Sequence, residues 1–184
     1  MEFAGLIEEI KSGNESAQDA LFKKLSGRMF IVCRRYIKNT EDAEERMLDG
    51  FCNVFLNIGS FEYKADAAFL NWMKQIMIHA CMRQLRKKNT VSILPETAAG
   101  DVPMQDDIVN KLSASEIYKL IMVLPEGYRT VFNLYVIDGF DHNEIGRLLN
   151  ISANTSRTQL LQARKLLQKK LNSNKHNHEP ALSK

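Results

Sequence analysis

Near the carboxyl end of the chain, one predicted helix carries side chains suited to recognising nucleic acid. Residues 153–171 have helical periodicity, and their polar and basic members lie opposite a packing face that includes Leu160 and Ala163. Amide side chains can pair with base edges in a major groove, lysines can hold phosphates, and a leucine can touch a thymine methyl. The outward set is predicted to comprise Asn154, Thr158, Leu161, Gln162, Lys165 and Lys169.

A second chemical pattern combines aromatic residues with a basic helix end. Phe61, Tyr63, Phe69 and Trp72 precede a segment that closes on Arg83, Arg86, Lys87 and Lys88 without any acid. Strand separation needs a surface on which unstacked bases stack while cations hold the backbone, and stacking is worth roughly 1–3 kcal/mol per base. Phe69 and Trp72 share helical spacing with Ile76 and are assigned to the core. The predicted DNA surface is therefore the loop 61–68 with Asn71, Gln75 and His79 on the following helix.

A third pattern is an acidic stretch in the first half of the chain. It contains Glu41, Asp42, Glu44, Glu45 and Asp49, interrupted by one base, Arg46. The net charge of the chain is only +3, so the uneven distribution of charge carries more information than its sum. Alone, the acidic stretch fits either a docking face for a basic partner or a solvated helix face.

The elements that position these residues are predicted to be helical throughout. Residues 1–90 contain no proline and show apolar spacing of three and four, which predicts a helical domain. Residues 91–112 include Pro95, Gly100 and Pro103 and predict a flexible linker. Residues 113–172 predict a second helical domain, and 173–184 a disordered tail. The expected fold is all-α, with two small helical domains.

The second domain has the spacing of a helix-turn-helix. A short helix is predicted from Asp141 or His142 to Leu149, followed by a turn over 150–152 with Ser152 as the N-cap of the long helix. In such motifs the second helix enters a major groove. An ordinary amphipathic helix with a solvated basic face produces the same pattern, so periodicity alone leaves both interpretations open.

Several classes of function are not indicated by the sequence. It lacks a glycine-rich phosphate loop, GxSxG and HExxH, so no enzyme, cofactor or metal site is predicted. Cys33, Cys52 and Cys81 are widely spaced within apolar helical runs and are expected to be reduced core thiols. Neither a signal peptide nor a span of roughly 20 apolar residues is seen, and a cytoplasmic protein is expected.

The segment LPEGYRTVFNLYVIDGFDHNEIGRLLNISANTSRTQLLQARKLL, residues 124–167, resembles region four of bacterial sigma factors. Shared features are the leucine-proline-glutamate start, the Tyr-Arg pair, the glycine turn and the Ala-Arg pair that ends the helix-turn-helix. The resemblance implies contact with the minus-35 promoter element through Asn154, Thr155, Arg157, Thr158, Leu161, Gln162 and Lys165. Family members often have arginine at the positions of Gln159 and Gln162 and glycine at that of Asn154, so the preferred DNA sequence stays open.

The segment EDAEERMLDGFCNVFLNIGSFEYKADAAFLNWMKQIMIHACMRQLRKK resembles sigma region two, with its acidic helix, paired phenylalanines and Phe-x-x-Trp step. The resemblance implies docking on the clamp helices of the polymerase beta-prime subunit through Asp42, Glu44, Glu45, Met47, Asp49 and Phe51. It also implies minus-10 recognition and melting through Phe61, Tyr63, Lys64, Asn71, Gln75, His79, Arg83 and Arg86. Asparagine is common in the family at the position of His79.

Together the two resemblances imply a sigma factor of the small extracytoplasmic-function type. Its expected partners are core RNA polymerase, promoter DNA and, as is common in the family, an inhibitory anti-sigma protein. The main alternative is a dimeric helix-turn-helix regulator that binds a palindromic operator without polymerase. A more remote alternative is a helical adaptor with no specific affinity for DNA. Neither alternative requires both halves of the resemblance.

Overall fold

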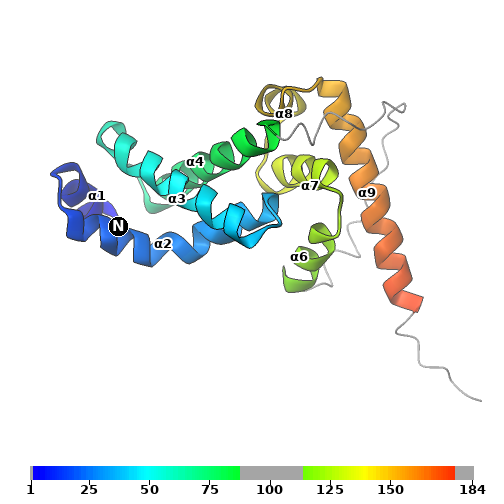
Figure 1. The fold of residues 1–184 in the computed structure, drawn as a ribbon, viewed down its shortest axis with the longest axis horizontal. Coiled ribbons are helices and arrows are strands. Elements are labelled where there is room, and N and C mark those ends of the chain that lie inside the picture. Colours follow the sequence, from blue (N-terminus) through cyan, green and yellow to red (C-terminus); the bar gives the residue numbers. More distant parts are fainter. Residues whose placement is uncertain (1, 88–113, 177–184) are drawn as a thin grey trace, which may run out of the picture. The chain divides into compact units, whose positions relative to one another are not determined.

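The computed structural model describes residues 2–87 and 114–176, and every regular element within these ranges is helical (Figure 1). The chain divides into two compact units, Met1–Lys87 and Lys88–Lys184. The predicted all-α class with two helical parts is therefore confirmed. The predicted linker, 91–112, lies outside the described residues.

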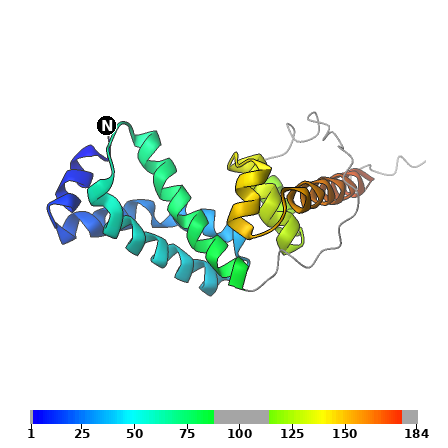
Figure 2. The same ribbon diagram turned by 90° about the horizontal axis from the view of Figure 1, so that it is seen from above.

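The first unit contains four α-helices and one short 3-10 turn. These are α1 (Ala4–Lys11), α2 (Glu15–Tyr36), α3 (Thr40–Asn57), η1 (Ile58–Ser60) and α4 (Asp66–Lys87). Helices α2, α3 and α4 pack against one another, whereas α1 packs on α2 and η1 (Figure 2). This arrangement brings the start of the chain close to the turn that precedes α4.

Asparagine caps begin two of these helices. The Asn14 side chain accepts hydrogen bonds from the backbone amides of Ser16 and Ala17, at 3.0 and 3.3 Å, and Asn39 accepts one from Asp42 at 2.8 Å. Each cap satisfies amide groups that have no partner inside the helix. Between α3 and α4, the side chain of Met77 fills the space beside Gly50, since a Cβ atom on Gly50 would lie 2.1 Å from the Met77 sulfur.

The second unit is built around its last helix. It contains α6 (Ala114–Met122), α7 (Glu126–Phe132), the π-helical turn η2 (Asn133–Ile137), α8 (His142–Leu149) and α9 (Ala153–His176). Helices α6, α7 and α8 all contact α9. The buried apolar residues of this unit include Leu124, Val131, Leu134, Ile145, Leu160 and Ala163.

Helix α9 is longer than the sequence predicted. It continues to His176, so the disordered tail expected from residue 173 is wrong for residues 173–176. Extending a formed helix costs little per residue, and the first proline beyond it is Pro180. Residues 177–184 lie outside the described part of the chain.

Candidate nucleic-acid interface

The helix-turn-helix of the second unit is fixed by local hydrogen bonds at both helix starts. Asp141 caps α8 by accepting from the amides of Asn143 and Glu144, and the Glu144 carboxylate accepts from the Asp141 amide at 2.8 Å. Ser152 caps α9, because its hydroxyl oxygen accepts from the Thr155 amide at 2.9 Å. The predicted Ser152 cap is thus confirmed, and the Asp141 cap agrees with the helix start predicted at Asp141 or His142. The hydrogen bond from the Glu144 amide is the main reason that the pKa of Asp141 is lowered.

The turn between α8 and α9 depends on two backbone features. Asn150 adopts the left-handed conformation, with φ 57°, which asparagine tolerates better than most residues. Gly146 lies so close to the turn that an added Cβ would stand 2.8 Å from the carbonyl oxygen of Ile151. The Ile151 amide in turn donates to the Gly146 carbonyl at 3.1 Å. Any side chain at position 146 therefore forces the two helices apart.

A pair of contacts that periodicity did not reveal also joins the helices. His142 Nδ1 lies 2.9 Å from the hydroxyl of Ser156, which is fully buried in α9. The imidazole stacks on Tyr135 of η2, with ring centroids 4.5 Å apart. The contact could have been predicted from the sequence, since His142 opens the predicted helix and Ser156 lies on the packing face of α9. These contacts orient α9 relative to α8.

The surface of α9 differs in part from its predicted outward set. Asn154, Arg157, Lys165 and Lys169 are exposed, whereas Thr155 and Gln162 are half-buried. Thr158 and Leu161 are each only 5% exposed, so the prediction that they face outward is wrong. Helical periodicity indicates only one packing face, but α9 contacts three helices of its own unit. Residues 158–161 are consecutive and all buried, so no single face contains them.

In the first unit, Phe61 before α4 forms one cluster with Phe69 and Trp72 of α4. The ring of Phe61 lies 4.7 Å from that of Trp72 and 5.4 Å from that of Phe69, measured between centroids. Phe69 is fully buried, as predicted, and Phe61 and Trp72 are half-buried. The loop ends sooner than expected, because α4 begins at Asp66 and the loop covers 61–65. Within it, Tyr63 is half-buried and Lys64 is exposed.

Helix α4 carries a polar and basic row that starts beside this loop. Asn71, His79, Arg83 and Arg86 are exposed and Gln75 is half-buried. Their spacing of three and four residues places them along one side of the helix. Partial burial lowers the pKa of His79, and Arg86 and Arg83 lower it further. The lowered pKa favours the neutral imidazole, which can accept a hydrogen bond as well as donate one.

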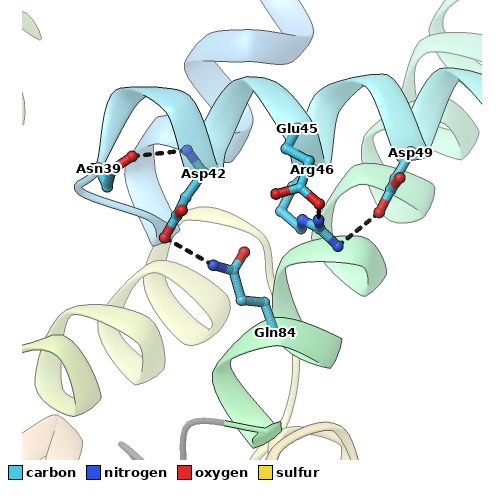
Figure 3. A network of polar contacts seen from close by, with 6 residues as sticks. All are labelled: Asn39, Asp42, Glu45, Arg46, Asp49 and Gln84. Atoms are coloured by element: carbon cyan, nitrogen blue, oxygen red, sulfur yellow. Dashed lines mark hydrogen bonds and ion pairs between the residues drawn. The ribbon is translucent and has the colours of Figure 1, made fainter.

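Figure 3 shows three of the acidic residues of α3, Asp42, Glu45 and Asp49, with the polar groups that contact them. Asp42 accepts a hydrogen bond from the Gln84 amide of α4 at 3.0 Å. Arg46 pairs with Glu45 and also with Asp49, the second pair at 2.7 Å. Arg46 thus partly balances two of the five predicted acids. Glu44, Glu45 and Asp49 are exposed, and Asp49 is also paired with Arg46.

Two of the predicted docking residues on α3 are core residues. Met47 is 5% exposed and Phe51 is 2% exposed, so a direct surface role for either is wrong. They fall on the side of α3 that also buries Ala43 and Val54. The opposite side presents Leu48 and Leu56, which are not among the predicted docking residues, and Leu56 is 82% exposed. Leu56 lies eleven residues beyond Glu45 and seven beyond Asp49 along the helix, and this spacing could have placed it on their exposed side.

The three cysteines, all in the first unit, differ in burial. Cys33 and Cys81 are buried, as expected, but Cys52 is exposed, so its assignment to the core is wrong. The hydrogen bond with Cys33 and burial raise the pKa of Cys81.

Within residues 2–87 and 114–176, no group of three or more histidine, cysteine or acidic side chains could hold a metal ion. Over the same ranges, no helix has the length and apolar character of a membrane span.

Two family models match the chain in sequence order. Residues 21–91 match sigma-70 region 2, and residues 114–167 match sigma-70 region 4. The first match covers the aromatic loop and helices α3 and α4, and the second covers the helix-turn-helix.

Several sigma factors are similar to this chain over most of their length. The ECF RNA polymerase sigma factor SigW of Bacillus subtilis is 29% identical over 178 residues, covering 90% of this chain and 94% of the relative. The ECF RNA polymerase sigma factor SigM of Mycobacterium tuberculosis is 25% identical, with 88% and 80% covered. Among solved structures, CnrH in complex with the cytosolic domain of CnrY matches with a TM-score of 0.47 and 17% identity, covering 91% of this chain and 96% of that chain.

Proposed function

The chain belongs to the sigma-70 family as a factor of the extracytoplasmic-function type that directs RNA polymerase to promoters, and from this premise we propose how its two units divide the work. The first unit binds core polymerase and opens the minus-10 element. The second unit binds the minus-35 element through its helix-turn-helix. The observation that carries this division is the order of the two matches, each on its own compact helical unit.

For the minus-35 element, the proposed contacts are the residues at the start of α9 and its basic side. Asn154 and Arg157 are exposed immediately after the tight turn, in the part of a recognition helix that meets base edges. Lys165 and Lys169 lie about two and three helical turns beyond Arg157 and suit phosphates. Because Thr158 and Leu161 are buried, they are left out of the proposed contact surface.

For the minus-10 element, the loop 61–65 and the polar row of α4 are proposed to act together. Phe61 and Tyr63 offer partly covered aromatic faces, and Lys64 is exposed between them and α4. Asn71, Gln75 and His79 continue the surface, and Arg83 and Arg86 suit the backbone phosphates. A melted base captured on this surface replaces part of the stacking energy that it loses in the duplex.

For core polymerase, the proposed docking face is the exposed side of α3. It combines Glu44, Glu45 and Asp49 with the apolar side chains of Leu48 and Leu56. Apolar groups surrounded by charge are typical of interaction surfaces, since the apolar part supplies affinity and the charges supply specificity. The beta-prime clamp remains the predicted partner surface.

Further expectations follow from the family. The role is non-catalytic, because polymerase itself performs the chemistry of RNA synthesis. Work with core polymerase on chromosomal promoters takes place in the cytoplasm, which stays the predicted location. An anti-sigma partner stays a prediction as well.

The test is run-off transcription with purified bacterial core polymerase and a library of promoter DNA, with and without this protein. Transcripts that require the protein should begin downstream of two spaced sequence motifs, and the motifs define the two elements. Specific DNA binding without polymerase and without transcripts would instead indicate a dimeric regulator. Absence of any specific DNA binding, with or without polymerase, would indicate the adaptor.

A further inference from the structure

One carboxylate joins the beginning of the chain to the loop before α4. Asp66 Oδ2 accepts a hydrogen bond from the backbone amide of Glu2 at 2.9 Å, and Oδ1 accepts one from the amide of Phe3 at 3.0 Å. The hydroxyl of Tyr63 donates to the same Oδ1 at 2.7 Å. Asp66 therefore fixes two segments that are far apart in sequence.

Apolar and ionic contacts support the same junction. The ring of Phe3 is 3% exposed and lies 5.5 Å from that of Phe69, which also packs against Phe61. The Lys24 ammonium of α2 pairs with Glu2 at 2.6 Å and lies over the ring of Phe3. Residues 2–3 are thus held to the first unit by Asp66 and Phe69 of α4 and by Lys24 of α2.

The protonation states of Tyr63 and Asp66 keep their hydrogen bond intact at neutral pH. The hydrogen bond to Asp66 is the main cause that raises the pKa of Tyr63 to about 12. The Glu2 amide and then the Tyr63 hydroxyl lower the pKa of Asp66 to about 2. At neutral pH the phenol keeps its proton and the carboxylate stays ionised, so the donor and the acceptor do not exchange roles.

We propose that Asp66 is a positioning residue for promoter opening, which holds the loop 61–65 in its binding conformation through Tyr63 and through residues 2–3. The inference rests on the proposed minus-10 function of this loop. A loop held in place before DNA arrives avoids the entropy cost of ordering at the moment of base capture. Loss of the junction should therefore slow strand opening and leave polymerase binding unchanged, since the proposed docking face lies on α3.

The functional test compares Asp66→Asn, Tyr63→Phe and the double variant in the full-length protein with core polymerase. Asparagine keeps the shape of the side chain but replaces a charged acceptor, so open-complex formation on duplex promoter should fall roughly tenfold. On a template already unpaired at the minus-10 element the loss should be much smaller. The double variant should lose less than the sum of the two single losses, because both changes act on the same Tyr63–Asp66 hydrogen bond.

A second readout uses the free protein and does not depend on polymerase. Trp72 is the only tryptophan in the chain and packs against Phe61, so its fluorescence reports the position of the loop. Acrylamide should quench Trp72 more strongly in Asp66→Asn and Tyr63→Phe than in the wild type. The matched control is Asp19→Asn, which removes the same charge from the exposed side of α2, where Asp19 pairs with Lys23. It should change neither readout.

The outcomes separate the inference from the function on which it rests. Wild-type opening and wild-type quenching in Asp66→Asn would overturn the positioning role. Weaker binding to core polymerase, or additive losses in the double variant, would overturn it too, because Asp66 would then act on folding or Tyr63 on DNA by itself. If the wild type yields no polymerase-dependent transcripts, the proposed function fails, and Trp72 quenching alone decides whether the junction holds the loop.

Discussion

At the scale of single residues, exposure separates the side chains of α9 that can meet DNA from those that cannot. Arg157 is exposed directly beside Thr158, which is buried. Replacement of Arg157 by alanine should reduce discrimination among minus-35 sequences by roughly 1–3 kcal/mol, the usual value of a good base contact. Holoenzyme affinities for promoters with single minus-35 changes would measure it. Arg28→Ala, in α2 of the first unit, is the control, and equal effects of the two variants would contradict the assignment.

The carboxyl of Asp66 also predicts how stability depends on pH. Its pKa is about 2 in the folded protein, against an ordinary value of 3.8, first because of the hydrogen bond from the Glu2 amide. A carboxyl with a lowered pKa stabilises the fold above its unfolded pKa, and this contribution is lost as the pH falls through the folded value. Between about pH 4 and about pH 2, the unfolding free energy of the first unit should fall more in the wild type than in Asp66→Asn.

Urea unfolding followed by the fluorescence of Trp72 measures this difference, because the single tryptophan lies in the first unit. Asp19→Asn should keep the wild-type decline. An identical decline in Asp66→Asn would mean that the carboxylate adds nothing to stability in this range.

At the scale of elements, the helix-turn-helix depends on the missing side chain at position 146. Gly146→Ala places a Cβ against the carbonyl oxygen of Ile151, and the backbone cannot yield as a flexible side chain could. The second unit should lose about 1–3 kcal/mol of unfolding free energy, as is typical of overpacking. Gly27→Ala is the control, since that position in α2 has open space and alanine favours helices. Circular dichroism melts should show loss in the first variant and no loss in the second.

Substitutions on the two faces of helix α3 should change different quantities: those on the exposed face the affinity for core polymerase, and those on the buried face the stability of the first unit. Leu56→Ala should leave the unfolding free energy within about 0.5 kcal/mol of the wild type, because the side chain is exposed. Its affinity for core polymerase should fall by roughly 1–2 kcal/mol. Met47→Ala should instead destabilise the first unit by about 2–5 kcal/mol, because the side chain is buried. Unaltered competition of Leu56→Ala for core polymerase would remove α3 from the docking face.

The same helices show what the sequence could and could not predict. The caps at Asp141 and Ser152 were predictable, because capping depends on residues within one turn. The burial of Thr158 and Leu161 was not, because periodicity identifies one packing face and cannot count the partners of a helix. Met47 and Phe51 were assigned to the surface by family resemblance, although the spacing of α3 places them with Ala43 and Val54. The Asp66 junction was missed, since nothing local links residues 2–3 to residue 66.

At the scale of the whole molecule, if both units bind promoter DNA as proposed, promoter affinity is a property of the whole chain. Once one unit is bound, the other searches at a raised effective concentration, so neither needs strong affinity alone. The basic side of α9 contributes to this affinity without regard to sequence if it holds phosphates.

Charge reversal tests that contribution. Lys165→Glu with Lys169→Glu should weaken binding to all promoters alike, and the slope of log affinity against log salt should fall by roughly two. Lys11→Glu with Lys23→Glu makes the same change of charge on exposed positions of the first unit and should leave the slope unchanged. A loss confined to particular promoter sequences would mean that these lysines read bases.

The Asp66 junction also bears on the order of events while the chain is being synthesised. Its bonds to Glu2 and Phe3 span 64 and 63 residues, whereas α1 meets α2, and α2 meets α3, in chain order. At roughly 5–20 residues per second, a ribosome takes roughly 3–12 s to advance from residue 3 to residue 66. Throughout that interval the ring of Phe3 lacks its partner Phe69. The packing of Phe3 on Phe69 can therefore form only after α4 has been synthesised, later than the packing of α1 on α2.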